Sequence, residues 1–141
     1  MNSPGRIVVG VDGSEASLDA LRWALRQAQL TNSELQAVTS WEYPSPIAEF
    51  VSDDIDWDGR ATTILDGALA VVGSTKGVTI TRATTQGHPA RVLIDASRDA
   101  DLLVVGSRGH GGFAGMMLGS VSAHVSAHAD CPVVVVRHHS A

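Results

Sequence analysis

The sequence predicts an α/β protein with an open, five-stranded parallel sheet that carries helices on both faces. Short apolar runs alternate along the chain with segments of helical periodicity, which is the pattern of repeated strand–helix–strand units. The strand candidates 6–11 and 102–105 are almost continuously apolar, as expected for strands buried on both faces of such a sheet. Right-handed crossovers make the sheet doubly wound. A length of 141 residues suits a single domain, 1–141.

The first half of the chain begins with a strand at 6–11, and Asp12-Gly13-Ser14 supplies a turn and a helix cap. A helix over 15–30 follows, because its apolar residues recur at helical spacing. The segment 34–41 reads as the second strand. The apolar positions that define the helix are Leu18, Leu21, Leu25 and Ala28.

The segment 43–59 is the least regular part of the chain and is interpreted as a long loop, with a helical turn as an alternative for part of it. It holds two prolines and an acidic patch. A solvated loop explains the patch; the alternative is a cation site, although the spacing of an EF-hand loop is absent. The patch consists of Asp53, Asp54, Asp56 and Asp58.

The second half repeats the alternation of strands and helices. A helix around 64–72 ends at Gly73, and 78–84 is a strand because β-branched residues alternate along it. A helix then starts with Pro89 at its first position. The remaining elements are a strand at 102–105, a glycine-rich loop, a helix over 120–128 and a valine-rich strand at 133–137.

Composition narrows the classes of function. The net charge of −5 argues against general nucleic-acid binding, which usually needs a basic face. No apolar run is long enough for a membrane span, and the first residues lack the features of a signal peptide. The single cysteine, Cys131, excludes an internal disulfide. These observations predict a cytoplasmic protein.

The stretch 104–122, VVGSRGHGGFAGMMLGSVS, carries the clearest functional signal. An apolar strand runs into a glycine-dense loop, and a Gly-Ser pair then opens a helix. Glycines let the backbone approach a ligand closely, and a helix start offers free N–H groups to phosphate. The spacing is G-x2-G-x9-G-S, formed by Gly106, Gly109, Gly119 and Ser120.

Two other nucleotide-binding motifs fit this block poorly. A P-loop needs a lysine beside its glycines, whereas the only lysine, Lys76, lies far from any glycine loop. Gly109, Gly111 and Ala114 match the dinucleotide fingerprint G-x-G-x-x-A, but that fingerprint belongs after the first strand. In this chain the match follows the fourth predicted strand, at 102–105.

The chain resembles the universal stress protein family, in its ATP-binding form, over essentially its whole length. The resemblance rests on the opening IVVGVDGSEAS, the segment GHPARVLIDAS, the glycine block and the closing CPVVVVR. It implies a Rossmann-like, adenine nucleotide alpha hydrolase-like fold. It also implies an ATP-binding regulator of the stress response, with Mg²⁺ as the expected counter-ion. The alternative is a slow ATP hydrolase or phosphotransfer enzyme on the same fold; no catalytic residue is predicted.

The resemblance also assigns roles to individual residues. Asp12 is expected near the adenosine, in contact with a divalent cation through water; a helix cap shared with Ser14 also explains it. Gly10 and Val11 pass close to the base, and Thr39 and Ser40 face the adenine through their backbone. The residues expected around the phosphates and ribose are Gly106, Arg108, Gly109, Gly111, Gly112, Gly119, Ser120, Val121 and Ser122.

The last strand and the last helix carry two further expectations. The strand of four valines, Val133, Val134, Val135 and Val136, presents an edge that could pair with another chain. The resemblance implies a homodimer through this strand. His124 and His128 have a spacing that can seat a metal ion, but the motif H-E-x-x-H is absent. We interpret them as surface histidines.

Overall fold

The computed structural model describes residues 4–43, 55–108 and 119–138. Nine helices and strands lie within these ranges, and they alternate along the chain. None of the helices in the described ranges is long and apolar enough to cross a bilayer. The elements are β1 (Arg6–Gly10), α1 (Glu15–Thr31), β2 (Glu34–Trp41), α2 (Trp57–Val71), β3 (Ile80–Gln86), α3 (Pro89–Ser97), β4 (Leu102–Gly106), α4 (Ser120–His128) and β5 (Val133–Val136).

The strands form one sheet in the order β3-β2-β1-β4-β5, and every pairing is parallel. The predicted parallel five-stranded sheet is therefore confirmed. β1 and β4 are neighbours at its centre, where the strand order reverses. In sheets of this kind the crevice at that reversal, beyond the carboxyl ends of the strands, is the usual ligand position.

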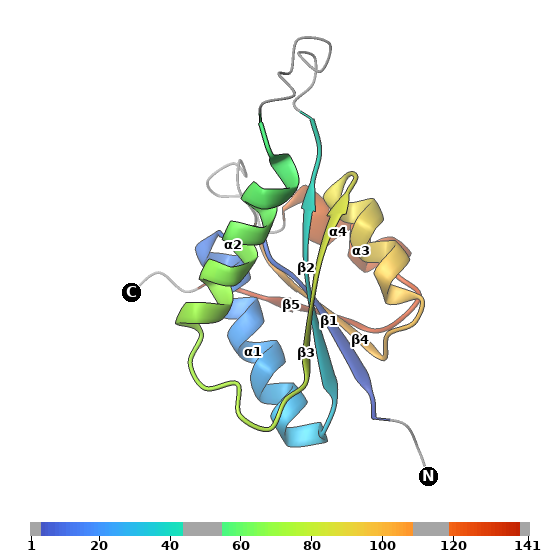
Figure 1. Cartoon of the computed structure of the whole chain (residues 1–141). Coiled ribbons are helices and arrows are strands. Elements are labelled where there is room, and N and C mark those ends of the chain that lie inside the picture. The colour runs from blue at the N-terminus through green and yellow to red at the C-terminus, as the bar shows by residue number, and fades with distance from the viewer. Residues whose placement is uncertain (1–3, 44–54, 109–118, 139–141) are drawn as a thin grey trace.

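Helices cover both faces of the twisted sheet, with α1 and α2 on one side and α3 and α4 on the other (Figure 1). Each pair buries its own apolar cluster. The cluster beneath α1 and α2 includes Leu21, Leu65 and Leu35, all fully buried. The cluster beneath α3 and α4 includes Leu103 and Val125. Alternate residues of β1 and β4 contribute to opposite clusters, which explains why these strands are apolar throughout.

The largest differences from the predicted boundaries are at α2 and β3. α2 begins at Trp57, inside the segment expected to be a loop, because the Asp56 carboxylate caps the helix by accepting a hydrogen bond from Gly59 N (2.9 Å). β3 begins two residues later than predicted and extends to Gln86, since its pairing with β2 runs from Leu35–Ile80 to Trp41–Gln86.

The acidic patch separates into structural roles where it is described. Asp56 caps α2, and Asp58 accepts hydrogen bonds from Trp41 Nε1 (3.1 Å) and Thr84 Oγ1 (2.7 Å). Asp58 therefore joins the start of α2 to β2 and β3. Asp53 and Asp54 lie outside the described residues.

Candidate functional site

A cavity of about 280 Å³ lies at the carboxyl ends of β1, β2 and β4, where the strand order reverses. Its size is close to the lower end of the range for small-molecule sites. One wall is apolar, and the other carries polar groups at the start of α4. The lining residues are Gly10, Val11, Asp12, Ser17, Val38, Ser40, Pro89, Leu93, Val105, Gly106, Arg108, Gly119, Ser120, Val121 and Ser122.

β1 and β2 separate at this crevice, and beyond their last hydrogen bond the backbone of one β2 residue, Ser40, faces it. Val11 N donates to Val38 O (2.8 Å), and this is the last bond between the two strands in the described chain. The backbone of a parallel strand faces its two neighbours alternately. Trp41 O accepts from Gly87 N on the β3 side, so Ser40 directs its N–H and C=O toward β1, beyond that last bond. Ser40 thus presents an adjacent donor and acceptor to the cavity.

The start of α4 forms the opposite, polar end of the cavity. Gly119 is the N-cap and makes no side-chain cap, so within the described ranges the first N–H groups of the helix lack the usual side-chain partner. Ser120 is exposed at the first helical position, and Arg108, which also lines the cavity, has no ion-pair partner in the described ranges. A helix start and an arginine together favour a bound anion.

Two glycines permit close packing around the cavity. A Cβ on Gly106 would meet the carbonyl carbon of Ala16 at 2.7 Å, so β4 can end against the backbone of α1 only without a side chain. A Cβ on Gly10 would meet Leu93 Cδ1 at 2.9 Å. Packing therefore accounts for Gly106, which the motif placed among the phosphate contacts.

Asp12 and two serines organise the turn that leads into α1. Ser14 N and Ser14 Oγ both donate to Asp12 Oδ1, at 2.9 and 2.5 Å. Ser14 is the N-cap of the helix and accepts from Ser17 N, while Ser17 Oγ accepts from Asp12 N at 3.3 Å. Ser14 alone is therefore the N-cap, and Asp12, which lines the cavity, fixes the capping serine by accepting from its N–H and its hydroxyl.

Ser122 also has a structural role. Its hydroxyl is buried and donates to the carbonyls of Ser107 (3.2 Å) and Gly119 (3.1 Å). Ser107 N in turn donates to Val136 O at the end of β5 (2.8 Å). The start of α4 is therefore tied to the ends of both β4 and β5.

Most of the described residues that the sequence singled out lie together at this cavity, and Thr39 is the exception. Its side chain shares the sheet face of Leu35 and Ala37, under α1 and α2, whereas Val38 and Ser40 line the cavity. Gly109, Gly111 and Gly112 lie outside the described residues. Sequence reasoning missed Ser17, Val38, Leu93 and Val105 as lining residues, because their apolar or helical pattern signalled only the core.

The buried hydroxyl of Thr39 leads to a prediction about the stability of the protein. It is 3% exposed, and its Oγ1 has no hydrogen-bond partner among the described residues. A buried hydroxyl without a partner costs free energy, so Thr39→Val should raise the free energy of unfolding by about 1 kcal/mol, measured by urea denaturation. The matched control is Thr84→Val on the neighbouring strand, which removes a bond to Asp58. If both variants lose stability equally, the Thr39 hydroxyl has a partner in solution.

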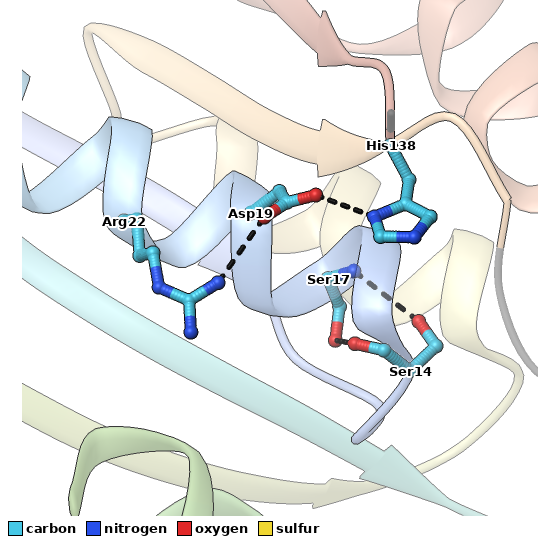
Figure 2. A network of polar contacts seen from close by, with 5 residues as sticks. All are labelled: Ser14, Ser17, Asp19, Arg22 and His138. Atoms are coloured by element: carbon cyan, nitrogen blue, oxygen red, sulfur yellow. Dashed lines mark hydrogen bonds and ion pairs between the residues drawn. The ribbon is translucent and has the colours of Figure 1, made fainter. Parts of the chain in front are cut away.

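A second polar network joins α1 to the residues that follow β5 (Figure 2). His138 Nδ1 lies 2.6 Å from Asp19 Oδ2, and Arg22 contacts the other oxygen at 3.1 Å. The hydrogen bond with His138 is the main reason that the pKa of Asp19 is lowered, with burial opposing it.

This network predicts a pH dependence. Because the pKa of Asp19 is lower in the folded state, its ionised carboxylate stabilises the fold at pH values above the unfolded-state pKa. This stabilisation is lost as the pH falls through the folded-state pKa. His138→Ala should therefore raise the pKa of Asp19, measured by carboxyl NMR titration, and make acid unfolding depend less on this group. Arg22→Ala should have a smaller effect, since its contributions are weaker. An unchanged Asp19 titration in His138→Ala would show that the contact does not persist in solution.

Comparisons with a family model and with curated proteins both identify universal stress proteins as the relatives of this chain. The model of the universal stress protein family matches residues 4–137. Universal stress protein Rv2623 of Mycobacterium tuberculosis is 40% identical over 135 residues, which cover 93% of this chain and 44% of the relative. A universal stress protein of Mycolicibacterium smegmatis is 35% identical and is covered over 47% of its length. The chain thus spans about half the length of the curated relatives it matches.

Solved structures show the same fold. A universal stress protein in complex with cAMP superposes with a TM-score of 0.73 at 29% identity, over 98% of this chain and 100% of that one. A family protein from Arabidopsis thaliana with AMP bound has a TM-score of 0.70 at 22% identity, over 97% of this chain and 94% of that one.

Proposed function

Because this chain belongs to the universal stress protein family, we propose that its crevice binds ATP with Mg²⁺. We propose further that the protein acts as a nucleotide-dependent regulator in the stress response. The observation that carries the proposal is the arrangement of the crevice: a donor–acceptor pair of Ser40 at one side and the uncapped start of α4 at the other. The relative solved with cAMP binds an adenine nucleotide, which supports the same ligand class here.

The base is assigned to the apolar part of the cavity, which β2, α3 and β4 form. Val38, Leu93 and Val105 provide apolar surfaces for a flat ring. The N–H and C=O of Ser40 complement the N1 acceptor and the amino group of adenine. Guanine reverses this order, since it presents a carbonyl and an N–H at those positions. The backbone of Ser40 thus selects adenine without a specific side chain.

The phosphates are assigned to the start of α4. The N–H groups around Ser120 and the Arg108 guanidinium can bond phosphate oxygens with charge assistance. Gly109, Gly111 and Gly112 are proposed to complete the phosphate contacts. Val121 belongs to the cavity wall, and the Ser122 hydroxyl holds the helix start in position.

The proposed metal position involves Asp12. Mg²⁺ prefers oxygen ligands and keeps several waters, with one or two carboxylates and the substrate phosphates as partners. Asp12 carries the only carboxylate among the described residues that line the cavity, so the donor chemistry fits a cation held through water. Asp12 would orient such a hydrated ion beside the phosphates.

Mass spectrometry of the protein purified without added nucleotide tests the ligand class. Denaturation should release an adenine nucleotide, and a protein freed of ligand should show a higher melting temperature when ATP and Mg²⁺ are added. Release of a flavin or a nicotinamide dinucleotide would contradict the proposal. So would a melting temperature that ATP leaves unchanged.

The proposed homodimer uses the free edge of β5. Ser107 N bonds Val136 O and Leu103 N bonds Pro132 O, so by alternation Val133 and Val135 turn their backbone groups away from β4. All four valines are only half-buried. A second copy pairing with this edge would form an isologous interface.

Val135→Pro should therefore give a folded monomer. Proline removes the outward N–H of the edge strand and leaves the bonds to β4 in place. Analytical ultracentrifugation measures the oligomeric state. Val134→Pro is the control, because it removes an N–H that faces β4 and should destabilise the fold instead. A Val135→Pro protein that remains a dimer would show that the two copies associate elsewhere.

A further inference from the structure

The histidines of α4 lie together on the outside of the molecule, away from the proposed nucleotide. His124 and His128 are both exposed, and their ring centroids are 4.8 Å apart with the planes inclined by 43°. The two residues are one helical turn apart, so their side chains share a face of the helix. The sequence indicated two surface histidines; the structure adds that the rings approach each other.

This separation matches the one required for two imidazoles that bind the same ion. With metal–nitrogen bonds of about 2.0–2.1 Å and bond angles between square-planar and tetrahedral, the two ring centroids lie roughly 4.5–5.2 Å apart. The observed 4.8 Å falls inside this interval. The separation of the two rings is therefore compatible with chelation of one metal ion, with the ring orientations set by the ion.

We propose that His124 and His128 form a surface site for a divalent transition-metal ion of the Ni²⁺, Cu²⁺ and Zn²⁺ class. Neutral imidazole suits these ions, whereas Mg²⁺ and Ca²⁺ prefer oxygen ligands. No third histidine, cysteine or carboxylate completes a cluster within the described residues, so water fills the other positions. The site is thus an open, exchangeable one, and not a closed structural centre.

The ion would also link two successive turns of α4. This helix has nine residues and no side-chain N-cap, so its own stability is low. A chelate between positions four apart stabilises the helical form, because the pair can bind the ion together only when the turn is formed. The first residues of the same helix line the cavity.

Isothermal titration of the untagged, full-length chain with NiCl₂, in a buffer free of chelators at neutral pH, tests this site. One Ni²⁺ should bind per chain and raise the melting temperature. His124→Ala and His128→Ala should each weaken binding about tenfold or more, since one nitrogen ligand is lost. Acidification should release the ion, because protons compete for the imidazoles.

A variant with the same number of histidines separates chelation from general affinity for histidine. His124→Ala combined with Ala127→His leaves two exposed imidazoles on α4 at adjacent positions, which do not face each other. It should bind Ni²⁺ as weakly as His124→Ala alone, while His138→Ala should bind like the unmodified chain. No saturable binding by the unmodified chain, or undiminished binding by the rearranged variant, would overturn the proposal.

Discussion

Replacing Ser120 with proline is expected to weaken ATP binding roughly 10- to 100-fold without disturbing the fold. Ser120 is the first residue of α4, a position where proline is well tolerated. Gly119 already has the extended conformation that a residue before proline adopts, with φ −71° and ψ 162°. The substitution therefore removes only the N–H and the hydroxyl proposed to bond phosphate. Isothermal titration with ATP and Mg²⁺ measures the loss.

The control for this variant is Ser120→Ala, which retains the backbone N–H and removes the hydroxyl. It should lose less affinity than the proline variant, and circular dichroism should show the same helix content for both. If Ser120→Pro binds ATP as tightly as the unmodified chain, the start of α4 does not hold the phosphates.

Adding a single methyl group at Gly106 is expected to destabilise the protein by about 1–3 kcal/mol. The new Cβ of Gly106→Ala would lie 2.7 Å from the carbonyl carbon and 2.8 Å from the carbonyl oxygen of Ala16. Backbone cannot move aside as a flexible side chain can, so the end of β4 or the start of α1 has to shift. Chemical denaturation measures the change.

Gly67→Ala is the matched control, because it adds the same methyl group in α2 where nothing lies within 4 Å. It should stabilise the protein by about 0.5–1 kcal/mol, since alanine favours the helix. Equal stability of the Gly106→Ala variant and the unmodified chain would mean that β4 and α1 are not in close contact. The end of β4 and the start of α1 both lie beside the cavity. The affinity for ATP should therefore fall in the Gly106→Ala variant and stay unchanged in the Gly67→Ala variant.

The parallel five-stranded sheet could be anticipated because the signals for its strands and helices are local and repetitive. The apolar runs at 6–11 and 102–105 and the helical spacing of Leu18, Leu21 and Leu25 express burial directly in the sequence. The order of the strands depends on their pairing in space and was not predicted. The start of α2 was not anticipated. A single capping contact, from Gly59 N to Asp56, decides it, and the surrounding prolines and acids resemble a loop.

The site, like the fold, was predictable from the sequence only in part. Glycine spacing placed Gly106, Gly119 and Ser120 at one cavity, since the ends of parallel strands meet at the same sheet edge. It could not distinguish a glycine that packs against Ala16 from one that meets a ligand. Nor could it show which residue of β2 faces the cavity; this depends on where β1 leaves the sheet, after the bond from Val11 to Val38.

A comparison of ATP with GTP shows whether the crevice recognises adenine through Ser40 and phosphate through α4. In equilibrium titrations of the nucleotide-free protein with Mg²⁺ present, ATP should bind saturably and GTP roughly 100-fold more weakly, because guanine opposes both backbone groups of Ser40. Equal affinities for ATP and GTP would contradict recognition of the base by Ser40, and no binding of either nucleotide would contradict the assignment of the crevice.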